Sequence, residues 1–204
     1  MTFKFDSHFY AMIDTAAGHE PVALAQLYLE AGARVMQLRM KNASARDILA
    51  AARVIAELNR RRGATFIVND RVDLAILSGA DGVHLGQDDL PIEAARKLIE
   101  SKMIIGISTH SVEQARAAEA SGADYIGFGP MYPGGLKENA SGKGLAMLQE
   151  VRAAVRIPIV AIGGITEARV PEVLTAGANA AAIITDVIRA PDIAAKVRSI
   201  LAIS

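Results

Sequence analysis

A weak internal repeat constrains the fold of this sequence more than any other feature. Its four copies read EAGARVM, SGADGVH, SGADYIG and TAGANAAA, and each places a Gly-Ala pair between a helix-like segment and a strand-like one. Glycine is expected just past a helix, because it enters the left-handed backbone region without a penalty from a Cβ atom. The four glycines are Gly32, Gly79, Gly122 and Gly177, and their spacing of 43 to 55 residues allows two strand–helix units per interval. The repeat therefore predicts eight such units.

Short apolar runs alternate with longer segments of helical periodicity. Eight of these runs are predicted strands, at residues 9–13, 34–40, 65–69, 82–86, 103–108, 125–129, 158–164 and 180–185. Between them, a segment such as ARDILAAARVIAELNRRR places apolar residues on one face of a helix, at Ile48, Leu49, Ala52, Ile55 and Ala56. Continuous apolar runs are typical of buried parallel strands. The alternation predicts an α/β fold.

Eight strand–helix units predict a (β/α)8 TIM barrel, formed as a single domain by residues 1–204. The alternative architecture, a doubly wound open sheet, does not require such regular pairing of units. A chain of 204 residues is long enough for one well-buried core, and no linker or low-complexity segment divides it. Since 51% of the residues are hydrophobic and only 4% aromatic, we expect that core to consist of Ala, Val, Ile and Leu.

Charge and composition narrow the classes of function. The 22 Lys and Arg balance the 22 Asp and Glu, so nothing draws the chain as a whole to nucleic acid or an anionic membrane. The absence of cysteine excludes disulfides and thiolate metal sites. The start MTFKFDSHFY lacks the apolar core of a signal peptide, and runs such as PIVAIGGI are too short to span a membrane. We therefore expect a soluble cytoplasmic protein without nucleic-acid or membrane partners; its oligomeric state stays open, a homodimer included.

Two neighbouring predicted strands each end in amide and carboxylate side chains. The third is followed by Asn69 and Asp70, and the fourth by Gln87, Asp88 and Asp89. Reactive groups of a (β/α)8 barrel gather at the C-terminal ends of the strands, so we expect one carboxylate from each strand to converge there. Oxygen ligands with room left for water suit Mg²⁺ bound to a phosphate-bearing substrate. The alternative is that Asp70 and Asp89 cap the helices that follow them.

The second predicted strand ends QLRMK, with polar side chains at every second position. Gln37, Arg39 and Lys41 are expected to point the same way. Such a stripe on a buried parallel strand is costly unless it faces a wet, occupied mouth. Because Arg offers a bidentate fork and Lys a point charge, the stripe is a candidate diphosphate clamp. A solvated edge stripe, the alternative, fits poorly on a strand with neighbours on both sides.

Three further strands bring other candidates to the same end. The fifth ends GISTH and presents Ser108, with His110 nearby; His110 is more typical of an N-cap or packing residue than of a catalyst. His84, within the fourth strand, is expected in the barrel interior. Gly163 and Gly164 after the seventh strand allow a ligand close to the backbone, in the loop region where this fold often binds phosphate. Together these features predict two anion sites at one mouth.

Nearly the whole chain resembles the thiamine phosphate synthase family. The resemblance is carried by QLRMK, VNDRVDLAILSGADGVHLGQDDLP, IIGISTH, GADYIGFGPMYP, Lys137 and IPIVAIGGI, of which the long middle block is the most specific. This family joins 4-amino-2-methyl-5-pyrimidinylmethyl diphosphate to a thiazole phosphate and releases pyrophosphate. The resemblance implies a dissociative reaction, in which Mg²⁺ and basic groups stabilise the departing pyrophosphate and the thiazole nitrogen captures a pyrimidine methylene cation.

The resemblance also assigns roles to individual residues. It implies that Asp70 and Asp89 are the Mg²⁺ ligands. The pyrimidine diphosphate would be held by Gln37, Arg39, Lys41, Asn69, Ser108 and Lys137, among which Arg39, Lys41, Ser108 and Lys137 would be catalytic. The thiazole phosphate would be held, largely through backbone amides, by Gly164, Ile184 and Thr185.

One segment departs from the family pattern. After Tyr-Pro the family usually has Thr-x-Thr-Lys, and here the sequence is GGLK, so that Gly134 and Leu136 replace the threonines while Lys137 stays. The glycines of loop 131–144 predict a mobile lid. The departure leaves the identity of the thiazole partner open.

Two other functions compete with the synthase. The related thiazole tautomerases share the barrel and the phosphate site, need not keep the metal carboxylates, and would use an acid/base residue such as His110. A non-catalytic barrel that binds phosphorylated ligands is the other alternative, motivated by the missing threonines. Both carboxylates and the complete diphosphate clamp favour the synthase.

Overall fold

A computed structural model shows the chain as a closed barrel of eight parallel strands in the order β1-β2-β3-β4-β5-β6-β7-β8. It describes the whole chain except residues 1–4, 6, 100–102, 134–141 and 204. The strands are β1 Phe9–Asp14, β2 Val35–Arg39, β3 Thr65–Asn69, β4 Gly82–Leu85, β5 Ile104–Thr109, β6 Tyr125–Phe128, β7 Ile159–Ile162 and β8 Ala180–Ala182. Each pairs in parallel with its neighbours, and β8 closes the barrel on β1 through Phe9–Ala181 and Tyr10–Ala182. The predicted TIM barrel is confirmed, and the open sheet is excluded.

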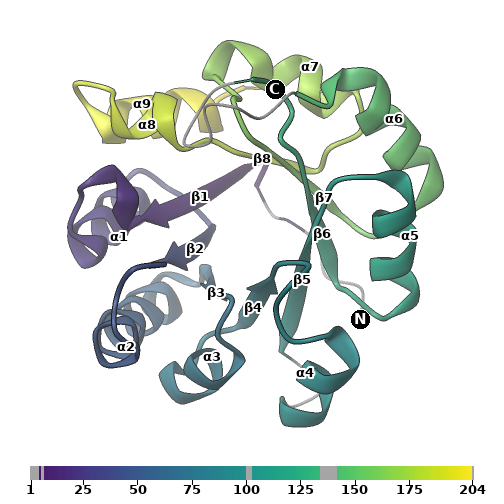
Figure 1. Ribbon diagram of the computed structural model, residues 1–204. Coiled ribbons are helices and arrows are strands. Elements are labelled where there is room, and N and C mark those ends of the chain that lie inside the picture. Colours follow the sequence, from purple (N-terminus) through teal and green to yellow (C-terminus); the bar gives the residue numbers. More distant parts are fainter. Residues whose placement is uncertain (1–4, 6, 100–102, 134–141, 204) are drawn as a thin grey trace.

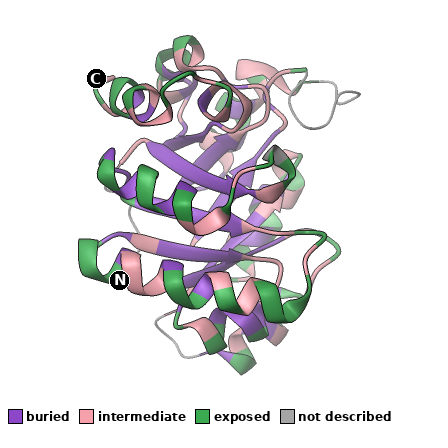
Figure 2. Ribbon diagram, turned by 90° about the vertical axis from the view of Figure 1, so that its left-hand side faces the viewer, coloured by how far each residue is buried: buried purple, intermediate pink, exposed green. Residues whose placement is uncertain are grey.

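Helices form a ring around the strands (Figure 1). They are α1 Pro21–Glu30, α2 Ala45–Arg62, α3 Val72–Ser78, α4 Ile92–Leu98, α5 Val112–Ala120, α6 Gly144–Ala154, α7 Val170–Thr175, α8 Thr185–Ile188 and α9 Ile193–Leu201, with short 3₁₀ turns η1 Thr15–Ala17 and η2 Glu167–Arg169. Figure 2 shows buried residues along the strands and exposed ones on the outer faces of the helices. This is the pattern that the apolar runs and the helical periodicity predict.

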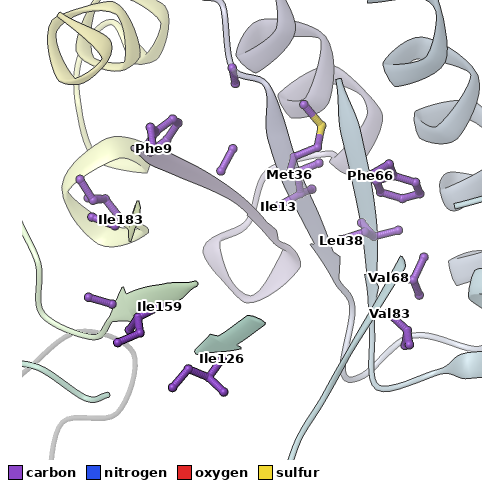
Figure 3. Close-up of a cluster of buried hydrophobic side chains, with 14 of the residues drawn as sticks. Phe9, Ile13, Met36, Leu38, Phe66, Val68, Val83, Ile126, Ile159 and Ile183 are labelled. Atoms are coloured by element: carbon purple, nitrogen blue, oxygen red, sulfur yellow. The ribbon is translucent and has the colours of Figure 1, made fainter. Parts of the chain in front are cut away.

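The core has two parts. The larger packs the outward-facing side chains of the strands against the helices; Figure 3 shows members of it such as Phe9, Met36, Phe66 and Ile159. The smaller part contains Tyr10, Met12, Val35, Tyr125, Val160, Ala180 and Ala182. Tyrosine thus contributes to a core that we expected to be almost entirely aliphatic.

The Gly-Ala repeat serves two purposes. Its four glycines all have positive φ, from 73° to 111°, just past helices α1, α3, α5 and α7. In three copies the residue after the Gly-Ala pair is Asp or Asn. Its side-chain oxygen accepts a hydrogen bond from a backbone N–H of the odd-numbered strand that precedes it in the sequence. These bonds join Asp81 to Phe66 at 2.8 Å, Asp124 to Ile105 at 2.7 Å and Asn179 to Ile159 at 2.9 Å. The repeat therefore fastens successive strand–helix units together.

All eight predicted strands are present, with differences at their ends. The last strand ends at Ala182, three residues earlier than expected, because the backbone of Ile184 turns out of the sheet (φ −105°, ψ −74°) and Thr185 begins α8. Strand β7 ends at Ile162, because Gly163 and Gly164 adopt φ of 96° and 66°. These early ends leave the loops after β7 and β8 as non-strand backbone.

Candidate functional site

The carboxylates of Asp70 and Asp89 converge after neighbouring strands β3 and β4. Burial raises the pKa of Asp70, and the adjacent Asp89 carboxylate raises it further, while Lys41 opposes both effects. Lys41 Nζ lies 3.5 Å from Asp70 Oδ2. Asp89 is fixed by its own loop, since the Gly86 N–H donates to Asp89 Oδ2 at 2.6 Å. Among the described residues, Lys41 is the lysine beside these two like charges, and such a pair favours an added cation.

The backbone at Asp70 is unusual. Among the residues that the structure describes, Asp70 is the one non-glycine residue with positive φ, at 63°. The Arg71 N–H donates to the Asn69 carbonyl at 2.8 Å, so a γ-turn is centred on Asp70, and the Asp70 N–H donates to the His84 carbonyl at 2.8 Å. Strained backbone of this kind costs about 1–3 kcal/mol and is concentrated at functional sites. The turn directs the Asp70 carboxylate towards the loop of Asp89.

Neither carboxylate caps a helix. The N-cap position of α3 is Arg71, and that of α4 is Pro91; neither makes a side-chain capping bond. The capping alternative for Asp70 and Asp89 is therefore wrong.

The polar stripe of β2 runs from the barrel interior to the mouth. Gln37 is 4% exposed, whereas the Arg39 and Lys41 side chains are 26% and 53% exposed. Arg39 Nη1 lies 2.6 Å from Asp14 Oδ2, and Lys41 pairs with Asp70 as described. The alternation that aligned the three residues in the sequence ends at Arg39, the last residue of β2, so Lys41 reaches the site from the following turn.

Asp14 belongs to this site, although the sequence analysis did not single it out. It is the last residue of β1, is 2% exposed, and lies opposite Arg39 in the strand register. A carboxylate at the end of a predicted strand was the available signal. That signal alone does not show that the carboxylate pairs with Arg39, because the pairing depends on the register between β1 and β2.

Ser108 ends a chain of buried hydrogen bonds inside the barrel. Its Oγ lies 2.9 Å from His84 Nε2, and His84 Nδ1 lies 2.9 Å from the Tyr125 hydroxyl. The Tyr125 and Tyr10 hydroxyls are 2.7 Å apart, and Gln37 Nε2 donates to the Tyr10 hydroxyl at 2.9 Å. Burial lowers the pKa of His84 to about 4, so the imidazole is neutral at pH 7. His84 lies in the barrel interior, as predicted; Tyr10 and Tyr125 were not predicted to take part.

Asn69 and Gln87 lie close to these groups. Asn69, the last residue of β3, is paired in register with His84 of β4. Gln87 Nε2 donates to the Ser108 carbonyl at 2.6 Å, which links the loop after β4 to the end of β5. The two clusters of amides and carboxylates seen in the sequence therefore surround one mouth.

The loops after β7 and β8 form the other side of the mouth. A Cβ atom on Gly164 would lie 2.8 Å from the Tyr132 carbonyl oxygen, so only glycine fits there without a shift. Arg169 Nη1 donates to the Gly164 carbonyl at 2.8 Å, and its guanidinium lies 4.0 Å from the centroid of the Tyr132 ring. The two loops are joined where the Glu167 N–H donates to Asp186 Oδ2 at 2.9 Å. This bond holds the Gly164 segment beside Ile184 and Thr185.

His110 does not cap α5; a cap was one of the two roles expected for it, and a packing residue was the other. The N-cap of α5 is Ser111, and His110 Nδ1 donates to the Gly129 carbonyl at 2.6 Å. Its backbone N–H donates to Gln114 Oε1 at 2.7 Å. Lys137, Gly134 and Leu136 lie outside the described residues, as does most of loop 131–144.

In the described part of the chain, no group of three or more His, Asp or Glu is placed to hold a metal by itself. No helix there combines the length and apolar character needed to cross a membrane.

Comparison with known proteins gives a consistent result. The profile of a family described as thiamine monophosphate synthase matches residues 9–187. The thiamine-phosphate synthase of Methanoculleus marisnigri is 48% identical over 184 residues, covering 90% of this chain and 87% of that protein. That of Pelotomaculum thermopropionicum is 48% identical over 187 residues, covering 91% and 86%. Among solved structures, thiamine phosphate pyrophosphorylase from Pyrococcus furiosus has 38% identity and a TM-score of 0.87, covering 94% of this chain and 92% of that one.

Proposed function

The chain belongs to the thiamine monophosphate synthase family and is a transferase, and on this premise we propose its substrates and its metal. The substrates are 4-amino-2-methyl-5-pyrimidinylmethyl diphosphate and a thiazole phosphate, and the products are thiamine phosphate and pyrophosphate. The observation that carries this proposal is the convergence of Asp70 and Asp89 beside Lys41 at one barrel mouth, with Arg39 on the next strand. That mouth offers both signs of charge that a metal-bound diphosphate requires.

The residues present fit Mg²⁺. Mg²⁺ is usually held by one or two carboxylates together with water and substrate phosphates, rather than by an all-protein cage. Asp70 and Asp89 supply that number of carboxylates. Burial and the neighbouring Asp89 carboxylate raise the pKa of Asp70, and a bound cation would oppose both effects. When bound, the ion would neutralise negative charge on the diphosphate. Asp70 and Asp89 would hold it.

The basic residues of β2 and of the turn after it stabilise the leaving group, pyrophosphate. Arg39 offers a planar fork of donors, anchored by Asp14, and Lys41 adds a mobile positive charge. As the bond between the pyrimidine methylene carbon and the diphosphate oxygen breaks, negative charge accumulates on pyrophosphate. Donors that are already in position stabilise this charge without reorganisation. Catalysis here consists of positioning and charge stabilisation, with the thiazole nitrogen forming the new bond to carbon.

The thiazole phosphate is proposed to bind at the loops after β7 and β8. Gly164 carries no side chain, which lets the Tyr132–Pro133 segment pack against the backbone after β7. In the loop after β8, Ile184 is the N-cap of α8 and Thr185 is its first residue. Arg169 adds a positive charge to this side of the mouth. The site thus has two anion-binding regions, one basic and next to the carboxylates, the other dominated by backbone.

Cellular location and assembly complete the proposal. We place the enzyme in the cytoplasm, in keeping with the balanced charge of the chain and the biosynthetic role of its relatives. A homodimer is the oligomer that we expect, and analytical ultracentrifugation would test it. The substrates are small phosphorylated molecules, and no nucleic-acid partner is proposed.

The decisive variants lie side by side in the sequence. Asp89→Asn should lower Mg²⁺-dependent pyrophosphate release by at least about a hundredfold, because a carboxylate ligand and its charge are lost. The matched control is Asp88→Asn, an identical change at the exposed neighbouring carboxylate, which should leave the rate within about twofold. Equal activity in the two variants would contradict the metal assignment. Turnover that needs no metal and depends on His110 would instead support a tautomerase, and binding without turnover a non-catalytic barrel.

A further inference from the structure

Five polar side chains cross the barrel interior in one hydrogen-bonded chain. They come from five strands and are Gln37, Tyr10, Tyr125, His84 and Ser108, with successive distances of 2.9, 2.7, 2.9 and 2.9 Å. The first four are between 1% and 8% exposed, and Ser108 lies at the mouth end of β5. Burying so many polar groups is costly unless all are paired, so such a network is expected to hold one arrangement.

Two glycines in the strands leave space for the side-chain rings of this hydrogen-bonded network. A Cβ atom on Gly106 of β5 would lie 2.1 Å from Tyr125 Cζ, closer than non-bonded atoms can approach. A Cβ atom on Gly127 of β6 would lie 3.1 Å from His84 Cε1. Glycine weakens a strand interior, and a common reason to find it there is the close approach of another group. Here the approaching group is the Tyr125 ring at Gly106 and the His84 ring at Gly127.

The positions of the protons follow from the chemistry of each group. The Gln37 amide nitrogen can only donate, so the Tyr10 oxygen accepts from it. Among the described residues, the acceptor for the Tyr10 proton is the Tyr125 oxygen. Tyr125 then donates its own proton to His84 Nδ1, and the ring proton of a neutral His84 must lie on Nε2. From there it is donated to Ser108 Oγ.

We propose that this hydrogen-bonded network positions the Ser108 hydroxyl. It holds His84 as the Nε2–H tautomer, so that Ser108 Oγ accepts from His84 and turns its own proton towards an acceptor atom of the substrate. Tyr10, Tyr125 and His84 are positioning residues that act through Ser108 and need not touch the substrate. The substrate part of this inference rests on the proposed function; the tautomer does not.

Nuclear magnetic resonance tests the tautomer directly. Protein labelled with ¹⁵N in its histidine rings contains four such rings, and the spectrum of a His84→Gln variant identifies the one that belongs to His84. We expect His84 to show a protonated Nε2 and an unprotonated Nδ1 that accepts a hydrogen bond. The opposite tautomer would overturn the proposal. This result does not depend on activity, so it also separates failure of this inference from failure of the proposed function.

Kinetics test the consequence for Ser108. Tyr125→Phe keeps the ring but removes the hydroxyl, and we expect kcat/KM to fall about tenfold, the effect of losing one hydrogen bond to substrate. On a Ser108→Ala background the same change should have less than about a twofold effect, because the group being positioned is already gone. Additive losses would contradict a role that acts through Ser108.

A matched control and a second variant make the kinetic test robust. Tyr28 is another fully buried tyrosine, and its hydroxyl donates to the Met12 carbonyl, which is not part of the hydrogen-bonded network. Tyr28→Phe should therefore leave kcat/KM within about twofold of the wild-type value. If Tyr125→Phe does not fold, Tyr10→Phe breaks the chain one link earlier and carries the same expectation. Rates of Tyr10→Phe and Tyr28→Phe that are both unchanged would overturn the proposal.

Discussion

Asp14 and Arg39 form the tightest charged contact of the site, with Arg39 Nη1 2.6 Å from Asp14 Oδ2. They lie opposite each other in the register of β1 and β2. The other Asp14 oxygen accepts the Ala16 N–H at 3.0 Å, so both oxygens are engaged. The carboxylate is buried, whereas the guanidinium is partly open to the mouth. Asp14 therefore orients the partly exposed guanidinium of Arg39, which donates a hydrogen bond to no other described residue.

Asp14→Asn should loosen Arg39 without removing it. The variant keeps an oxygen for the Ala16 N–H but loses the charge that orients the guanidinium. We expect KM for the pyrimidine diphosphate to rise about tenfold, with a smaller change in kcat, in steady-state assays. The control is Asp192→Asn, the same change at the N-cap of α9, where Asp192 accepts the Ala195 N–H. A similar rise in KM in both variants would show that the effect is not specific to Arg39.

Asp70→Asn should make the metal-free protein more stable while it abolishes turnover. Because the folded-state pKa of Asp70 is raised by burial and by Asp89, the charged form is a cost that grows as the pH rises above the ordinary Asp value. Asparagine removes the charge and tolerates the positive φ of this position. We expect a higher Tm than wild type at pH 7 in EDTA, and no charge-derived gain near pH 3, by calorimetry. A lower Tm at pH 7 would be inconsistent with unrelieved repulsion at this site.

Acid should destabilise the protein through His84. Its folded-state pKa, about 4, lies below the ordinary value of 6.5, so the unfolded chain binds the proton more readily. Stability from this group is present above pH 6.5 and is lost as the pH falls towards 4, by about 3 kcal/mol in total.

Denaturant unfolding of wild type and His84→Gln between pH 7 and pH 4 measures this contribution. The advantage of wild type over the variant should shrink by about that amount across the range. Parallel stability profiles would mean that His84 titrates normally in the folded protein.

Gly164→Ala should impair the thiazole phosphate region by steric conflict. The new Cβ would lie 2.8 Å from the Tyr132 carbonyl oxygen, so the loop must move. We expect KM for thiazole phosphate to rise at least about tenfold. Gly63→Ala is the matched control, because Gly63 has nearly the same φ, 63° against 66°, but no atom within 4 Å of the added Cβ. It should cost about 1 kcal/mol of stability and leave KM unchanged; equal KM values in the two variants would exclude a role for Gly164 in binding.

The fold could be predicted because its signals are local and repeated. Apolar runs, helical periodicity and four Gly-Ala pairs all indicate one architecture, and the structure has it. The ends of strands were less predictable. The apolar run from Ala180 to Thr185 reads as one strand, yet the backbone turns at Ile184, a choice that depends on closing the barrel against β1.

The site was only partly predictable, for a different reason. Asp70 stands out because it directly follows an apolar strand, and Asp89 because it lies in the polar segment just after the next one. Tyr10 and Tyr125 read as ordinary core residues, since nothing local indicates that their hydroxyls meet across the barrel, 115 positions apart in sequence. Asp14 was missed because the pairing of its carboxylate with Arg39 depends on the register between two strands.

The most direct test of the central claim is a product assay with purified protein. The protein is mixed with 4-amino-2-methyl-5-pyrimidinylmethyl diphosphate, thiazole phosphate and Mg²⁺, and thiamine phosphate and pyrophosphate are quantified together. We expect both products in equal amounts, their loss in EDTA, and their recovery when Mg²⁺ is restored. Absence of thiamine phosphate while calorimetry shows bound diphosphate, or formation of product that is indifferent to EDTA, would contradict it.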